Sequence, residues 1–126
     1  GRGEHAEDAA AGSRWDDATD AYLKSLRTPQ KTWLKTRAAL RLLDVAATAH
    51  RYDAVITAYL SLVHTDPTQA LAHRPTLPDA DSAYIDTALA ATSNALAEPN
   101  LTDDQKQSLL SLQLDLYRIR KDDVRA

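Results

Sequence analysis

Glycine is confined to the start of this 126-residue chain, at positions 1, 3 and 12. The rest of the chain lacks the residue that tight hairpin turns and phosphate-binding loops need for backbone conformations with positive φ. This excludes nucleotide sites built on glycine-rich loops and argues against a sheet of short hairpins. The α-helix is left as the element from which a domain of this length can be built.

The five prolines, at positions 29, 67, 75, 78 and 99, divide the chain into long proline-free stretches. Because proline interrupts a helix interior, we predict that these stretches are helices. Helix-start signals favour the same interpretation. They are Ser13 with Asp16, Thr28 before Pro29, Asp66 before Pro67, and a capping box formed by Thr102 and Gln105.

Apolar residues at steps of three and four predict about six helices in an all-α antiparallel array. The first covers about Glu4–Ala11 and ends at Gly12. The apolar rows of the other five are Trp15, Ala18, Tyr22 and Leu26; Leu34, Ala38, Leu42, Val45 and Ala49; Tyr52, Val55, Tyr59 and Leu62; Ile85, Ala88, Leu89 and Leu96; and Leu109, Leu112, Leu116 and Ile119.

Two of these helices carry additional apolar residues. Residues 110–116, LSLQLDL, alternate as a strand would, but leucine is not β-branched and a capping box lies just upstream, so we predict a helix. The fourth helix has a second row, Ile56, Leu60 and Val63, beside its first. We therefore expect this helix to be covered on two sides.

Composition limits the possible partners and surroundings. Apolar residues make up 44% of the chain and charged residues 26%, which is the balance of a folded soluble domain. A net charge of −3 disfavours nucleic acid as a partner, and no apolar run approaches the length needed for membrane insertion. The chain has no cysteine, which leaves a cytoplasmic or a periplasmic location open. It also has no methionine, so either an initiator was removed or the chain is a piece of a longer protein, and we favour the second explanation. We expect the parent protein to be bacterial.

An internal repeat runs through the first half of the chain. Trp15 and Tyr22 recur as Tyr52 and Tyr59 at a spacing of 37 residues, and Pro29 recurs as Pro67. A helix–turn–helix unit of this period is typical of helical repeat arrays. Aromatic residues at helical spacing usually pack between helices, so we predict that Trp15, Tyr22, Tyr52 and Tyr59 are packing residues.

Over residues 30–67 the pattern resembles the tetratricopeptide repeat family. The residues that carry the resemblance are Leu42, Tyr52, Ala58, Tyr59, Leu62, Val63, Asp66 and Pro67. Leu43 and His50 stand where the family often has glycine, and Ala39 replaces its frequent tryptophan. The resemblance implies one domain over residues 1–126, a short TPR-like right-handed solenoid of stacked helical hairpins. An irregular connection is expected at about 66–79, with at most a short helix around Thr68–His73.

No constellation of catalytic or metal-binding residues emerges from the sequence. No two of the four histidines have a spacing that puts two ligands on one helical face. Asp79–Ser82 begins like a calcium loop but lacks its later glycine and glutamate, so a helix cap is the better interpretation. The pairs Asp16–Asp17 and Asp103–Asp104 are expected in first helical turns, where the helix dipole favours acids. We predict no catalysis, no metal and no cofactor.

The predicted role is therefore non-catalytic binding of a protein or peptide, or self-association. Lys31, Lys35, Arg37 and Arg41 give the third helix a basic side that could meet an acidic peptide or phosphate. The resemblance implies a concave groove lined by Arg37, Leu40, Arg41 and Asp44, with Ser111, Asp115 and Arg118 from the last helix. The family's carboxylate clamp needs lysine and asparagine where this chain has Leu40 and Asp44. The alternatives are a structural spacer, whose groove its own side chains or the Pro67–Pro78 connection would fill, and a regulatory domain fused to an enzyme.

Overall fold

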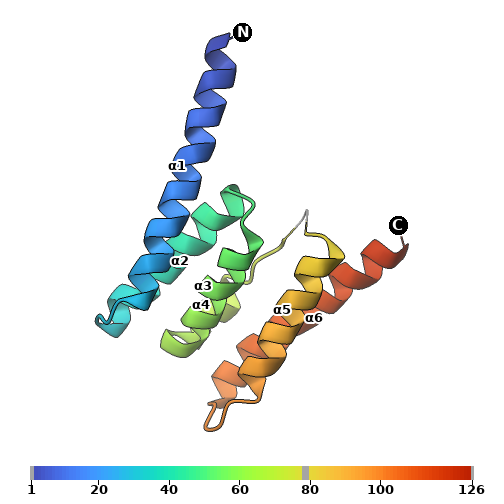
Figure 1. Cartoon of the computed structure of the whole chain (residues 1–126). Helices are drawn as coiled ribbons and strands as arrows, with labels where there is room; N and C mark the ends of the chain where they lie inside the picture. Colours follow the sequence, from blue (N-terminus) through green and yellow to red (C-terminus); the bar gives the residue numbers. More distant parts are fainter. Residues whose placement is uncertain (1, 78–79, 126) are drawn as a thin grey trace.

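The computed structural model describes residues 2–77 and 80–125, and over these ranges the chain is all-α, with six helices and no strand (Figure 1). This confirms the prediction of an all-α fold without strands. The helices are α1 (Arg2–Arg27), α2 (Thr32–Thr48), α3 (Tyr52–Thr65), α4 (Pro67–Ala72), α5 (Ser82–Leu96) and α6 (Asp103–Arg125).

Helix α3 is the centre of the fold and contacts every other helix. Both of its predicted apolar rows are covered: Tyr52, Val55, Tyr59 and Leu62 are buried, as are Ile56 and Val63, and Leu60 is half-buried. Complete burial of a large apolar side chain contributes about 1.5–3 kcal/mol. The expectation that this helix is covered on two sides is therefore confirmed.

The other helices form two groups around α3. Helix α2 packs against α1 and α3, whereas α5 packs against α6 and α3, and the short α4 lies between α3 and α6. Figure 1 shows α5 and α6 side by side beyond the α2–α3 pair. Within the described residues no helix of the second group packs on α2, so α2 has one face without a helical neighbour.

Three helix starts are fixed by side-chain caps. The Asp66 carboxylate accepts from the Gln69 backbone N–H at the start of α4, where Pro67 is the first residue, and Asp81 caps α5 by accepting from the N–H of Tyr84. In the capping box of α6, the N–H of Thr102 donates to the Gln105 side chain at 2.9 Å. The N–H of Gln105 donates to the Thr102 hydroxyl at 3.1 Å. These caps were predicted. Asp79, the first residue of the segment Asp79–Ser82 that was compared with a calcium loop, lies outside the described residues.

Three predicted boundaries are wrong. Helix α1 is continuous from Arg2 to Arg27, so it does not end at Gly12 and no new helix begins at Ser13. A glycine inside a helix costs only about 1 kcal/mol, and the alanine-rich sequence around Gly12 favours helix enough to offset it. Thr28 and Pro29 do not start α2, which begins at Thr32; instead the Thr28 hydroxyl donates to the Lys24 carbonyl and closes α1.

The buried face of α1 also differs from the prediction. Trp15 is 41% exposed and is not a core residue, whereas Thr19, one turn further on, is fully buried and Tyr22 packs against the core. The hydroxyl of Thr19 is satisfied because it donates to the Trp15 carbonyl at 2.8 Å. Trp15 and Tyr52, which match in the sequence repeat, therefore occupy different environments.

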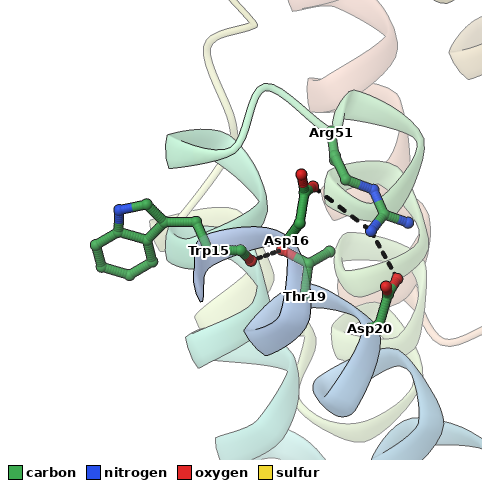
Figure 2. A network of polar contacts seen from close by, with 5 residues as sticks. All are labelled: Trp15, Asp16, Thr19, Asp20 and Arg51. Atoms are coloured by element: carbon green, nitrogen blue, oxygen red, sulfur yellow. Dashed lines mark hydrogen bonds and ion pairs between the residues drawn. The ribbon is translucent and has the colours of Figure 1, made fainter. Parts of the chain in front are cut away.

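An ion-pair cluster joins α1 to the start of α3. Arg51 lies just before α3 and pairs with two carboxylates of α1, at 2.6 Å to Asp20 and 3.8 Å to Asp16 (Figure 2). Asp16 is therefore a partner of Arg51 in the middle of α1, not a residue of a first helical turn. Figure 2 shows the Trp15 ring pointing away from this cluster. Docking of α1 thus brings its polar residues to Arg51 and leaves the large ring outside.

Residues 110–116 lie within α6, as predicted. Leu109, Leu112 and Leu116 are fully buried, whereas Leu110, Leu114 and Tyr117 form an exposed row on the same helix. The strand-like alternation of leucines therefore arises from two apolar rows on one helix.

Candidate functional site

A groove of about 830 Å³ lies along the face of α2 that has no helical neighbour. We call it the α2 groove. Its walls are α2, the first turn of α3 with the residues just before it, and the irregular segment 73–77. The segment that was expected to be a connection therefore forms one wall and leaves the groove open.

Helix α2 supplies most of the groove's functional side chains. Trp33, Arg37, Leu40, Arg41 and Asp44 line the groove, and at about 100° per residue these five positions fall on one face of the helix. Trp33 is 60% exposed, Arg37, Arg41 and Asp44 are exposed, and Leu40 is half-buried. The opposite side of α2, including Ala39, Leu42 and Ala46, is fully buried. Packing of that side on α1 and α3 directs the first set outward.

The opposite wall, residues 73–77, is fixed at two points. Leu77 is buried in the core although its φ is +48°, a conformation that costs a non-glycine residue about 1–2 kcal/mol. Burial of the leucine side chain, at about 1.5–3 kcal/mol, offsets this cost. Arg74 is held by an ion pair, in which its Nε lies 2.9 Å from a carboxylate oxygen of Asp115 on α6. This wall is thus attached to the second group of helices.

Aromatic side chains meet where α2 passes into α3, and two of them, His50 and Tyr52, line the groove. Tyr52 at the start of α3 is buried, and its ring makes edge-to-face contacts with His50 and Tyr84 at centroid distances of 6.1 and 5.8 Å. His50 follows α2 with a φ of +57°. The N–H of His50 donates to the Ala47 carbonyl and the N–H of Arg51 donates to the Ala46 carbonyl, which ends the helix.

The groove carries an excess of positive charge. Its lining includes Arg37, Arg41 and Arg74 but only one acid, Asp44, in a chain whose net charge is −3. Arg74 is paired with Asp115, whereas Arg37 and Arg41 form no ion pair with another residue in the described part of the chain. The two arginines stand one helical turn apart, so an anion could contact both.

The structure separates the predicted partner-binding residues into two sets. Arg37, Leu40, Arg41 and Asp44 line the α2 groove, and Ser111, Asp115 and Arg118 of α6 do not. Asp115 reaches the groove only through Arg74. Lys31 and Lys35, on the predicted basic side of α2, also lie outside the lining. The contribution of α6 to a common groove therefore remains a prediction.

Sequence reasoning missed the wall of residues 73–77. Their prolines and lack of periodicity indicated only a connection, and no local signal pairs Arg74 with an acid about forty residues away. Trp33 was also missed, because it falls outside the apolar row of its helix. An isolated large aromatic residue beside a run of basic residues was the one signal that could have drawn attention to it.

Two other polar features hold the framework together. The Tyr59 hydroxyl is buried and donates to the Ser108 carbonyl at 2.7 Å, which joins α3 to α6. Burial raises the pKa of Tyr59, and Asp115 raises it further while Arg74 opposes the shift. His64 Nε2 lies 2.9 Å from the Glu98 carboxylate, and a hydrogen bond to the Leu60 carbonyl together with Glu98 raises the pKa of His64.

Among the side chains that the structure describes, those of residues 14–77 and 80–121, no group of three or more acidic or histidine side chains could hold a metal ion. None of the described helices is both long and apolar enough to span a membrane. No family model, curated protein or solved structure matches this chain.

Proposed function

We propose that this protein is a non-catalytic interaction module, a TPR-like helical scaffold that binds a protein or peptide in the α2 groove. The single observation that carries the proposal is an uncovered helical face with aromatic, aliphatic and charged side chains at its surface, facing a separate wall. Surfaces of this kind accommodate extended partners, because stacked helices present a longer contact face than a closed pocket does.

The arrangement of α2 and α3 supports a TPR-like unit. The two helices pack as a hairpin over residues 32–65, and Asp66 and Pro67 follow at once, as in the repeat pattern. The face that the resemblance assigns to partner binding, Arg37 to Asp44, is also the face without a helical neighbour. Stacking of the two helical groups as a right-handed solenoid is part of the proposal.

The shape of the groove favours binding over a structural spacer. A spacer would fill this volume with its own side chains or with the connection after Pro67. Residues 73–77 instead stand along one wall and are held there by Leu77 and by the Arg74–Asp115 pair. About 830 Å³ remains between that wall and α2.

To test the proposal, a displayed library of random peptides is selected for binding to the chain. Ala47 is exposed and lines the groove, so Ala47→Trp should obstruct it without disturbing the core. Ala90→Trp on α5 is the matched control, because Ala90 is also an exposed helical alanine but lies outside the lining. We expect the unmodified chain and Ala90→Trp to enrich the same peptides and Ala47→Trp to lose them.

Two outcomes would reject the proposal. If the unmodified chain enriches no peptide above background, the groove is not a peptide site and a spacer is favoured. If Ala47→Trp, shown to be folded by circular dichroism, retains every peptide, binding occurs on another surface.

A further inference from the structure

The charges of the α2 groove indicate which chemistry a partner should bring. Arg37 and Arg41 are exposed, stand at i and i+4 on α2 and have no ion-pair partner in the described residues. Like charges at this spacing repel by a few tenths of a kcal/mol. An anion placed between them would remove the repulsion and accept hydrogen bonds from both guanidinium groups, for which carboxylates have a suitable geometry.

No other charged group of the lining competes with Arg37 and Arg41 for an anion placed between them. Arg74 stands on the opposite wall, and its guanidinium already binds Asp115. Asp44, the one acidic residue of the lining, lies one turn beyond Arg41 towards the end of α2. A ligand that enters along α2 therefore meets positive charge at Arg37 and Arg41 first and negative charge only at the far end.

The apolar lining distinguishes a peptide from a small anion. Trp33 is 60% exposed at the start of α2, and Leu40 lies on the same face between the two arginines in sequence. Pro75 and Leu77 form apolar parts of the facing wall. A free phosphate would use the arginines alone, whereas a peptide could pair with them and also cover Trp33 and Leu40, which contributes about 25 cal/mol per Å² of apolar area buried.

We propose that the partner of the α2 groove is an acidic peptide segment with at least one large apolar side chain. Its carboxylates bind Arg37 and Arg41, and its apolar side chain packs between Trp33 and the wall formed by Pro75 and Leu77. This inference rests on the proposed function and adds the chemistry of the partner. It requires no free C-terminus, because internal Asp or Glu side chains supply the carboxylates.

The experiment compares two charge-neutralising double variants of the same helix. Arg37→Gln with Arg41→Gln removes the groove arginines, and Lys31→Gln with Lys35→Gln removes the same charge from outside the lining. Each chain is used to select the displayed library, and the Asp and Glu content of the enriched peptides is compared with that of the starting library. One enriched peptide is then synthesised with its acids intact and with each acid replaced by its amide.

Affinity is read from the fluorescence of Trp33 in a Trp15→Phe background, since the chain has only these two tryptophans and Trp15 lies outside the groove. We expect acidic enrichment with the unmodified chain and with the lysine variant, and its loss with the arginine variant. The arginine variant should bind the synthetic peptide at least about tenfold more weakly, as charge-assisted hydrogen bonds imply, and the lysine variant less than about threefold.

Each contrary result has a distinct meaning. Enriched peptides without an acidic excess, or equal binding of the acidic and amide peptides, would overturn the inference and leave the proposed function standing. If both double variants weaken peptide binding equally, the acidic peptide responds to the overall charge of the chain and not to Arg37 and Arg41. That result would also overturn the inference. Full displacement of the peptide by inorganic phosphate at comparable concentration would indicate an anion site alone. If no peptide is enriched, the inference and the proposed function fail together.

Discussion

Tyr59 joins the two groups of helices, and its substitution tests the account of the fold most directly. The side chain is fully buried at the centre of α3, and its hydroxyl donates to the Ser108 carbonyl on α6 at 2.7 Å. Tyr59→Ala removes an entire buried ring and should destabilise the chain by about 3–5 kcal/mol. Tyr59→Phe keeps the ring and removes only the hydrogen bond, which should cost about 1 kcal/mol, since a carbonyl inside a helix keeps its intrahelical bond.

Burial of the Tyr59 hydroxyl should also make the free energy of unfolding depend on pH. The pKa of Tyr59 is raised in the folded chain by burial, above the ordinary value of 10.0 that the unfolded chain has. The stabilising contribution of the neutral phenol is therefore fully present below pH 10 and is lost as the pH rises towards the folded-state pKa. At one pH unit above the unfolded pKa the loss is about 1 kcal/mol.

Equilibrium urea unfolding at neutral pH and at a series of alkaline pH values measures both effects. Tyr117, which is 53% exposed on α6, provides the control. Tyr117→Phe should leave the free energy of unfolding within about 0.5 kcal/mol and should keep the alkaline decline, as surface changes do. Tyr59→Phe should flatten the decline. Equal alkaline slopes for Tyr59→Phe and the unmodified chain would refute the assignment of a buried, neutral hydroxyl, and an unchanged midpoint for Tyr59→Ala would refute the central position of α3.

Three further predictions concern other contacts. Thr102→Ala removes the capping box of α6 and should cost about 1 kcal/mol by urea unfolding, whereas Thr87→Ala on the exposed face of α5 should cost less; equal costs would argue against the cap. A double-mutant cycle of Arg51→Gln and Asp20→Asn should give a coupling energy of about 0.2–1 kcal/mol, because the Asp20 carboxylate is mostly exposed. A coupling energy of zero would mean that the pair does not help to dock α1. Because the pKa of His64 is raised on folding, His64 should contribute stability that is fully present below pH 6.5 and is lost as the pH rises through the folded-state pKa. Glu98→Gln should reduce this pH dependence of the free energy of unfolding. An unaltered pH profile in that variant would contradict the pairing of His64 with Glu98.

Local interactions explain what could be predicted from the sequence. The steps of three and four in α2, α3, α5 and α6, and the caps at Asp66 and Thr102, depend on residues within one or two turns of each other. The second apolar row of α3 likewise indicated burial on two sides, because a helix that is apolar around most of its circumference must be covered. These features follow from the chain because each is decided within a single helix.

Only the tertiary structure decided which faces meet. The face of α1 that is buried is set by its packing on α2 and the core, where Thr19 is fully buried and Tyr22 packs, and the exposed pair of Arg51 with Asp20, about thirty residues away, only adds to it. The α2 groove depends on Leu77 entering the core and on Arg74 reaching Asp115, and neither contact has a periodic signal. Arg37 and Arg41 could be identified as basic residues on one helix, but they are exposed beside an open groove because no helix of the described residues packs over that face. Such contacts join residues far apart in the chain, so their energies depend on the packing of whole helices and not on the neighbours of any one residue.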